Sequence, residues 1–380
     1  MGSPDQSEKL FVGLMSGTSM DGVDAALVRF GDRTCELVAT LQQPYPAALR
    51  EELRQASQNP DNMPVDHLCS LDSRVAESFA ETATALIDTA RADARNIAAI
   101  GSHGQTIRHQ PGGKPPFTLQ IGDPNIIAVR TGLTIVADFR RRDIAEGGQG
   151  APLTPAFHDW LFADKFAHSV VLNIGGFANI TVIASSSDET IGFDTGPGNT
   201  LMDAWISRHK SVAYDDSGNW AESGTVSDQL LRQLMSDPYF SAPPPKSTGF
   251  EYFNLDWLQE SLRSAGIVDS IATEDVQATL ADVTARSIAD AVMSHAQHTE
   301  QVYVCGGGVH NEHLLRRIRA YLPGIACVPT TECGLDPDWV EAVAFAWLAR
   351  QTLSGLPGNL PSVTGASRSA ILGGVYFGAG

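Results

Sequence analysis

The 380-residue sequence is poor in basic residues, in cysteine and in long apolar runs. It has 26 lysines and arginines against 44 aspartates and glutamates, which gives a formal net charge of −18 at pH 7. A surface with this charge repels phosphate backbones, so nucleic acid and anionic membranes are poor candidate partners. A small anionic ligand remains compatible with the sequence where basic residues are concentrated locally.

Cysteine is scarce, and its placement argues against two classes of protein. The five cysteines are scattered and no two are spaced as Cys-x-x-Cys, which disfavours a disulfide framework and a zinc knuckle. No apolar run approaches the roughly 18 residues of a membrane span, and the first residues lack the pattern of a signal peptide. We therefore expect a soluble, cytoplasmic protein with a flexible leader at residues 1–8.

Predicted strands alternate with predicted helices along the chain, which indicates an α/β fold. Each half opens with an apolar run, a glycine-rich turn and a second apolar run, at residues 10–30 and again at 169–184. This repeated pattern predicts two related α/β lobes with a ligand between them. We expect the first lobe at 9–145 and the second at 146–380, with the C-terminal segment packing back on the first lobe. Apolar spacing also predicts long helices at residues 66–91, 274–297 and 339–353.

Three glycine-rich loops directly follow predicted strands, at residues 16–24, 173–179 and 305–310. Glycine lets a ligand approach the backbone and its N–H groups, so such loops suit phosphate binding. Each loop could equally be a structural turn: an Asp-Gly hairpin, a β-turn and a strand-to-helix junction, respectively. The loops contain neither a Walker A sequence nor a Gly-x-Gly-x-x-Gly fingerprint, which argues against P-loop NTPases and Rossmann dehydrogenases.

Two phosphate-binding hairpins and one adenosine-binding loop, taken together, resemble the layout of the sugar kinase, actin and Hsp70 superfamily. Longer motifs resemble one family within it, the anhydro-N-acetylmuramic acid kinases, over nearly the whole chain from about residue 10 to residue 365. The resemblance implies a two-lobed actin/hexokinase/Hsp70-like fold with the active site in the interlobe cleft. The motifs that carry it are GLMSGTSMDGVD (13–24), GSHGQT (101–106), DFRRRD (138–143), GGQGAP (147–152), GFDTGPGN (192–199), PKSTG (245–249) and LPSVTG (360–365).

The same resemblance implies an activity. Such kinases use ATP and magnesium to convert 1,6-anhydro-N-acetylmuramic acid to N-acetylmuramic acid 6-phosphate, in bacterial cell-wall recycling. Water opens the anhydro bridge while the released O6 takes the phosphoryl group. A homodimer is implied by the resemblance alone.

The three loops and the segment at 192–199 supply the candidate residues for binding ATP. Asp21 is the candidate partner of Mg²⁺, directly or through water, and its alternative role is that of a turn residue. The ATP-binding candidates are Gly17, Thr18, Ser19, Met20, Asp21, Gly22, Val23, Asp24, Gly175, Gly176, Asn179, Gly196, Gly198, Gly306, Gly307 and Gly308.

Asp194 is the candidate general base, because it lies at the end of a predicted strand and the family's catalytic aspartate falls on this motif. Ordinary glycosidases use two carboxyl groups, one to activate water and one to protonate the leaving oxygen. Here the γ-phosphoryl group can take up the charge that develops on O6, so one base is enough. From the residue alone, Asp194 could instead cap the following helix.

Substrate recognition is predicted from the cluster Arg140, Arg141 and Arg142, the densest cationic spot in the sequence. An arginine fork suits the lactyl carboxylate of the sugar. We expect an extended segment here, in which consecutive residues face opposite ways, so that one or two arginines reach the site and at least one forms surface salt bridges. The other sugar-binding candidates are Ser102, His103, Gln105, Thr106 and Gln149.

Three assignments leave an alternative open. His103 could be a buried core histidine rather than a sugar ligand. Glu341 begins a predicted helix and is a candidate near the nucleotide, although a solvated or capping role fits it as well. Lys246 could likewise lie near the nucleotide or have only a structural role.

Two other classes of function are alternatives to a small-molecule kinase. A nucleotide-gated chaperone or filament protein would need an extra domain or a polymerising surface, and a hydrolase would use Asp194 without ATP.

Overall fold

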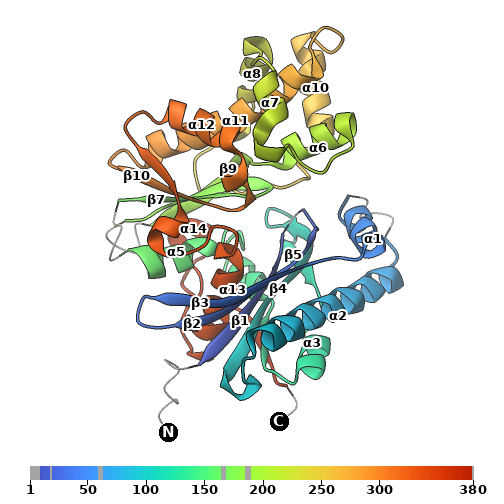
Figure 1. Ribbon diagram of the computed structural model, residues 1–380, viewed down its shortest axis with the longest axis vertical. Helices are drawn as coiled ribbons and strands as arrows, with labels where there is room; N and C mark the ends of the chain where they lie inside the picture. The colour runs from blue at the N-terminus through green and yellow to red at the C-terminus, as the bar shows by residue number, and fades with distance from the viewer. Residues whose placement is uncertain (1–8, 18, 59–62, 164–167, 185–189, 379–380) are drawn as a thin grey trace. The chain divides into compact units, whose positions relative to one another are not determined.

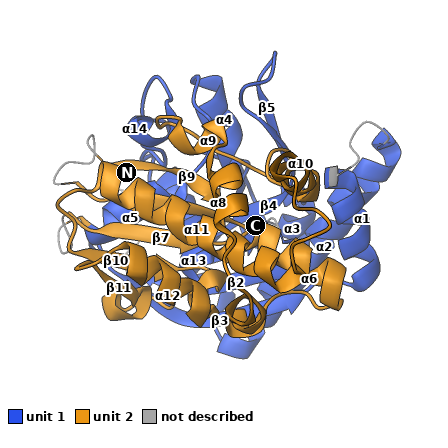
Figure 2. Ribbon diagram, turned by 90° about the horizontal axis from the view of Figure 1, so that it is seen from above, with its two compact units in different colours: residues 1–162, 339–380 blue, residues 163–338 orange. Residues whose placement is uncertain are grey.

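The computed structural model describes residues 9–17, 19–58, 63–163, 168–184 and 190–378 (Figure 1). The predicted leader at residues 1–8 lies outside the described residues. The chain forms two compact units (Figure 2): unit 1 is residues 1–162 and 339–380, and unit 2 is residues 163–338. The boundary therefore differs from the expected one at 145/146, because residues 146–162 and the C-terminal segment both belong to unit 1.

Unit 1 is built on a mixed sheet with the strand order β12-β6-β4-β1-β2-β3, and β5 pairs with β4 outside this path. Strands β1, β2 and β3 form an antiparallel meander, whereas β4 is parallel to β1 and β6 is parallel to β4. The strands are β1 (Leu10–Ser16), β2 (Gly22–Phe30), β3 (Cys35–Pro44), β4 (Ile97–Gln110), β5 (Phe117–Ile121), β6 (Ile135–Ala137) and β12 (Gly374–Tyr376).

Helices cover both faces of this sheet. Apolar side chains of β1, β2 and β4 form one buried cluster with those of α2, including Leu71, Val75 and Phe79. Helix α13 packs against the other face at Gly13 and Gly101. The helices of unit 1 are α1 (Ala47–Gln58), α2 (Val65–Ala90), α3 (Pro124–Thr131), α4 (Phe139–Ala145), α5 (Thr154–Phe162), α13 (Val340–Leu353) and α14 (Pro361–Thr364), with a 3₁₀ turn at Ala94–Asn96.

Unit 2 has a mixed sheet of order β11-β10-β7-β8-β9. Its strands share one buried cluster with helices α11 and α12. The strands are β7 (Val170–Ile174), β8 (Phe177–Val182), β9 (Ile191–Pro197), β10 (Gln301–Cys305) and β11 (Ala326–Pro329). The helices are α6 (Thr200–Lys210), α7 (Asn219–Ser223), α8 (Asp228–Met235), α9 (Pro238–Ser241), α10 (Leu255–Ala265), α11 (Thr273–His295) and α12 (Glu312–Tyr321), with 3₁₀ turns at Asp216–Gly218, Gly307–His310 and Thr330–Cys333.

The two units repeat one topology. In each, an antiparallel meander of three strands is followed by two strands that run parallel to the first strand: β1-β2-β3 with β4 and β6 in unit 1, and β7-β8-β9 with β10 and β11 in unit 2. This repeat confirms the predicted pair of related α/β lobes. None of the helices in the described ranges combines the length and apolar character that crossing a membrane requires.

The predicted helices and the predicted extended segment had different outcomes. Helices at 66–91, 274–297 and 339–353 are confirmed within one or two residues. The extended segment expected at residues 138–143 is wrong, because Phe139–Ala145 is the helix α4. Asp138 takes a left-handed conformation (φ 63°) directly after β6, which turns the chain, and the helix then buries Phe139 and Ile144.

Unit 1 also buries histidines. His103 and His158 are almost inaccessible to solvent, and burial lowers the pKa of His158 to about 3 and that of His103 well below its usual range. Burial also lowers the pKa of His109 to about 4. All three side chains are therefore neutral in the folded protein at neutral pH.

The contact between α13 and the sheet leaves no room for a side chain at one position on β1 and one position on β4. A Cβ atom at Gly13 would overlap the carbonyl oxygen of Ala342, and one at Gly101 would overlap that of Phe345. We expect Gly101→Ala to lower the free energy of unfolding of unit 1 by about 1–3 kcal/mol, because the rigid backbone of α13 must shift. Urea unfolding measures this. Gly112→Ala is the matched control, since nothing lies within 4 Å of the place its new methyl group would take; equal stability of the two variants would contradict the expected clash.

The buried histidines predict acid sensitivity. Their folded pKa lies below the ordinary value of about 6.5, so between about pH 6.5 and pH 4 the unfolded state binds more protons than the folded state. Stability is therefore present above pH 6.5 and falls as the pH drops, by up to about 1.4 kcal/mol per pH unit for each histidine.

Chemical denaturation between pH 7.5 and 5 tests this slope. Replacement of His158 by Gln removes one buried histidine that must stay neutral, so stability should fall less steeply with decreasing pH. Replacement of the exposed His298 by Gln is the control for the substitution itself. A stability that stays constant from pH 7.5 to 5 would be incompatible with neutral buried histidines.

Candidate functional site

The loop between β1 and β2 is held by a buried side chain from β4. Gln105 is fully buried; its Oε1 lies 2.7 Å from the Ser16 hydroxyl and its Nε2 donates to the Gly17 carbonyl at 3.1 Å. A Cβ atom at Gly22 would overlap the carbonyl oxygen of Gln43, whereas Gly17 has open space around it. Thr18 lies outside the described residues. The remaining loop candidates differ in exposure: Ser19 and Asp21 are exposed, Asp24 is partly buried, and Met20 and Val23 are buried.

Asp21, the candidate for Mg²⁺, forms an ion pair with Arg50 of α1. Both side chains are about half exposed, at 54% and 47%. A carboxylate that acts together with substrate phosphates is a usual Mg²⁺ ligand, so Asp21 fits this role if Arg50 releases or shares it. Sequence reasoning had no signal for Arg50, because it lies outside the motifs.

The candidates on β4 point to opposite faces of the sheet. Gly101 and His103 face α13, since the His103 ring lies 4.7 Å from the Phe345 ring. Strand alternation places Ser102 on the other face, where its buried hydroxyl has no hydrogen-bond partner among the described residues. The structure therefore does not bring Ser102 and His103 together. Thr106 accepts a hydrogen bond from Gln120 at 3.1 Å.

Arg140 on α4 contacts His103 directly. Its Nε and Nη2 lie 3.1 and 2.9 Å from His103 Nε2, and its Nη1 donates to the carbonyl of Gly150 at 2.8 Å. On the opposite side of the ring, His103 Nδ1 lies 3.3 Å from the carbonyl oxygen of Ser16. His103 thus joins the glycine loop to the arginine motif.

The helical conformation of α4 separates the three arginines. Residues on a helix are about 100° apart, so the predicted alternation of inward and outward side chains is wrong here. Arg140 is partly buried, whereas Arg141 and Arg142 are exposed, and Arg141 lies 3.3 Å from the Asp138 carboxylate. Of the three, the structure connects Arg140 to the other motif residues.

Asp143 ties the middle of the chain to its C-terminal segment. The carboxylate is fully buried and accepts hydrogen bonds of 2.7 Å from the Gly150 N–H, the Asn359 amide and the Thr364 hydroxyl. The N–H of Gln149 donates to the Thr364 carbonyl at 2.8 Å. These bonds explain why residues 146–162 belong to unit 1. Sequence reasoning missed Asn359, although Thr364 lies in the last of the motifs.

In unit 2, the loop after β7 contacts the start of α6. The Gly175 and Gly176 carbonyls accept hydrogen bonds from backbone N–H groups of residues 198–200, at 2.9–3.0 Å. A Cβ atom at Gly198 would overlap the Gly175 carbonyl oxygen. The N–H of Gly198 is therefore occupied by an internal bond, and the glycine permits the close approach of the two loops.

Packing explains some loop glycines but not others. A Cβ atom at Gly306 would overlap Asn173, one at Gly308 would overlap Ile174, and one at Gly196 would lie 2.8 Å from the Phe240 ring. Gly307 has nothing within 4 Å, and Gly175 meets only an ordinary contact at 3.6 Å. With Gly17, each of the three loops thus has at least one glycine that internal packing does not require.

Asp194 lies on β9 and is held by the segment that follows α9. Its Oδ2 accepts from the N–H of Thr248 at 2.9 Å, its N–H donates to the Lys246 carbonyl at 3.1 Å, and its carbonyl accepts from the Tyr239 hydroxyl at 2.8 Å. The side chain is 9% exposed. The alternative of a helix cap is not seen, because α6 begins at Thr200 with Asn199 as its cap residue.

Lys246 places a cation beside Asp194. Its Nζ donates to the Tyr239 carbonyl at 3.0 Å and lies 4.6 Å from the centre of the Tyr239 ring. The pKa of Lys246 is lowered by burial, and the negative charge of Asp194 offsets only part of this effect. Asn179 lies opposite Asp194 in the β8–β9 register, and its buried Oδ1 has no hydrogen-bond partner in the described part of the chain.

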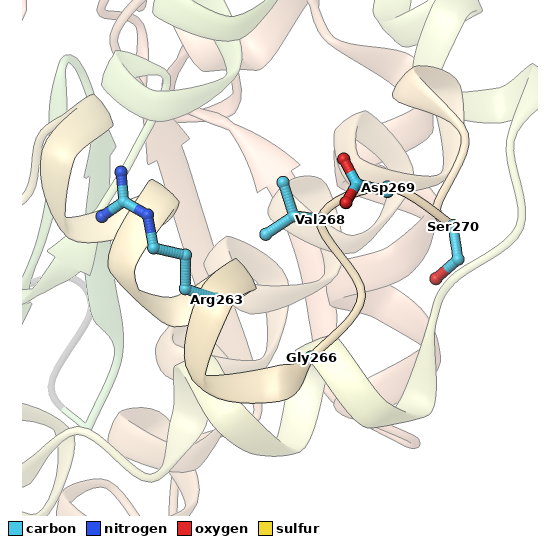
Figure 3. A pocket seen from close by; sticks show the side chains of 5 residues that line it. All are labelled: Arg263, Gly266, Val268, Asp269 and Ser270. Atoms are coloured by element: carbon cyan, nitrogen blue, oxygen red, sulfur yellow. The ribbon is translucent and has the colours of Figure 1, made fainter.

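Three further observations bear on the candidate site. Within the described ranges, no three His, Cys, Asp or Glu side chains group as metal ligands would. A hollow of about 380 Å³ at the end of α10 is lined by Arg263, Gly266, Val268, Asp269 and Ser270 (Figure 3). None of the candidate residues lines it. Glu341 is partly buried in the first turn of α13.

Comparison with known proteins identifies relatives over the whole length. The chain is 50% identical to an anhydro-N-acetylmuramic acid kinase of Coxiella burnetii (strain Dugway 5J108-111) over 97% of each chain. It is also 50% identical to one of Shewanella pealeana (strain ATCC 700345 / ANG-SQ1), over 96% of this chain and 98% of that one. A ROK family glucokinase from Streptomyces griseus, solved with glucose and AMPPNP, aligns with a TM-score of 0.40 at 14% identity, over 90% of this chain and 99% of that one.

The family model for anhydro-N-acetylmuramic acid kinase matches residues 9–378. This range includes the three glycine loops, the Arg140 helix and Asp194. Together with the identity to the curated relatives, the match shows that the chain belongs to the anhydro-N-acetylmuramic acid kinase family.

Proposed function

We propose that this kinase opens 1,6-anhydro-N-acetylmuramic acid with water and phosphorylates O6 from ATP, giving N-acetylmuramic acid 6-phosphate and ADP. The observation that carries the proposal is the fixed carboxylate of Asp194 on the motif that the family shares. In cells, the reaction would return a cell-wall sugar to metabolism. A homodimer is part of the proposal and rests on the family resemblance alone.

Asp194 acts on water in this proposal. O6 is locked in the anhydro bridge and has no proton to lose, so the base has to activate the nucleophile at C1. Water attacks C1, its proton passes to Asp194, and the C1–O6 bond breaks. The electron pair left on O6 attacks the γ-phosphorus, ADP leaves, and Asp194 later releases the proton to solvent.

Two contacts suit Asp194 to this role. The N–H of Thr248 holds one carboxylate oxygen, and a hydrogen bond to the charged form favours ionisation. The neighbouring Lys246 is attracted by the charge of Asp194, so its ammonium favours the carboxylate form in return. A base must be ionised before it can accept a proton.

The glycine loops are assigned to ATP. At Gly17, Gly175 and Gly307 of these loops, the lack of a side chain serves no close internal contact, which leaves the backbone open to a closely approaching ligand. Mg²⁺ would be held by Asp21 together with phosphate oxygens, and when bound it would neutralise charge on them. Arg50, now paired with Asp21, would then be released or shared.

Arg140 is assigned to the lactyl carboxylate of the sugar. It is the arginine that the structure connects to the other motifs, and a guanidinium binds a carboxylate through paired hydrogen bonds. Of the predicted sugar ligands, Gln105 and His103 also contact the β1–β2 loop. Ser102, His103, Gln105, Thr106 and Gln149 remain proposed sugar contacts.

Replacing Asp194 by Asn tests the base. The change keeps size and hydrogen-bonding reach but removes basicity, so we expect near-parent affinity for sugar and ATP by calorimetry. Sugar-dependent ADP release should fall by about 10²–10⁴-fold, the usual contribution of general-base catalysis. The control is Asp290→Asn, which removes an exposed carboxylate from α11.

The comparison of the two variants has clear outcomes. Parent-level turnover by Asp194→Asn would move the base to another residue, with Glu341 next to be tested. Opening of the sugar at an unchanged rate without ATP would replace the kinase proposal by a hydrolase.

A further inference from the structure

The contact between His103 and Arg140 determines which form of the imidazole is present. Two donors of one guanidinium, Nε and Nη2, point at the same ring nitrogen, Nε2, from 3.1 and 2.9 Å. Guanidinium groups only donate hydrogen bonds, so Nε2 must carry the lone pair. The proton of a neutral ring then lies on Nδ1, which is 3.3 Å from the Ser16 carbonyl oxygen and can donate to it.

The surroundings of His103 keep the ring neutral and prevent its rotation. The side chain is 5% exposed, and burial together with the charge of Arg140 lowers its pKa. Its ring packs on Phe345 with centroids 4.7 Å apart, and the Phe139 ring packs on Phe345 in turn, with centroids 5.6 Å apart. A ring held in this way presents its acceptor nitrogen in one direction.

A second acceptor holds the other branch of the guanidinium. Arg140 Nη1 donates to the Gly150 carbonyl at 2.8 Å, and the N–H of Gly150 is bound by the buried carboxylate of Asp143 at 2.7 Å. Asp143 is itself fixed by Thr364 and Asn359. Arg140 therefore lies between two acceptors, and each of them is anchored to a different part of unit 1.

We propose that His103 is a positioning residue for Arg140: the neutral imidazole, anchored on the carbonyl of the glycine loop, orients the guanidinium for the carboxylate of the sugar. The inference rests on the proposed role of Arg140 in sugar binding. It assigns selectivity for a carboxylate-bearing sugar to the contact between His103 and Arg140. Loss of the acceptor nitrogen leaves the guanidinium charge in place but removes its fixed orientation.

A substrate-selectivity experiment tests the proposal in the full-length enzyme. The selectivity is the ratio of kcat/KM for 1,6-anhydro-N-acetylmuramic acid to that for 1,6-anhydro-N-acetylglucosamine, which lacks the lactyl group. We expect His103→Phe, which keeps an aromatic ring on Phe345, to lower this ratio about tenfold or more, the usual contribution of one hydrogen bond to a charged group. The change should come from a higher KM for the lactyl sugar. His103→Gln restores an acceptor and recovers part of the ratio.

Two controls separate positioning from a general loss of structure. His158→Phe removes another buried histidine of unit 1 and should leave the ratio unchanged, whatever it does to stability. In the Arg140→Met background, which lacks the guanidinium, adding His103→Phe should cause no further loss of selectivity, because the two residues act through one contact. A folded His103→Phe enzyme with the parent ratio, or independent losses in the double variant, would overturn the proposal.

A measurement without substrate separates the positioning role of His103 from the proposed role of Arg140 in sugar binding. Nitrogen-15 NMR of histidine-labelled parent enzyme should show a neutral His103 with its proton on Nδ1, assigned by comparison with His103→Gln. A protonated ring or the opposite tautomer overturns the positioning role even if the enzyme phosphorylates the sugar. If the NMR result holds but the parent enzyme does not distinguish the two sugars, the role of Arg140 in the proposed function fails, and the selectivity role of His103 fails with it.

Discussion

Unit 1 depends on the close contact between helix α13 and the strands β1 and β4. Glycine at positions 13 and 101 lets the helix backbone touch the sheet, and this contact joins residues from the end of the chain to its beginning. It also places the Phe345 ring on His103. The orientation of Arg140 follows from that placement, because His103 is one of the acceptors that hold the guanidinium.

In unit 2, the carboxylate of Asp194 is held by hydrogen bonds rather than by a close helix–sheet contact. Asp194 is fixed by backbone and hydroxyl groups of the segment at residues 239–248 rather than by a neighbouring strand alone. Lys246 supplies a cation in the same segment. In the proposed role of Asp194 as the base, a carboxylate fixed in this way needs little rearrangement during the reaction, which is how preorganised sites lower a barrier.

Much of the architecture could be predicted from the sequence, because the pattern of apolar runs, glycine loops and long helices repeats in the two halves. The division into units could not, because it depends on hydrogen bonds between residues far apart in the chain, such as Asp143 with Thr364. The helix α4 was missed because its first turn follows a left-handed Asp138, which the sequence does not reveal. The site candidates show the same limit: nothing in the sequence indicates that the side chains of Gln105 and His103 hydrogen-bond to the backbone of the β1–β2 loop.

Isotope labelling of the product tests the central claim, that water is the nucleophile at C1 while O6 takes the phosphoryl group. The enzyme is incubated with 1,6-anhydro-N-acetylmuramic acid and ATP in oxygen-18 water, and fragment masses of the product are measured soon after mixing, before exchange at C1. The account predicts one label on the C1 hydroxyl and none in the phosphate group. Label in inorganic phosphate, with the sugar unchanged, would show ATP hydrolysis instead and would contradict the account.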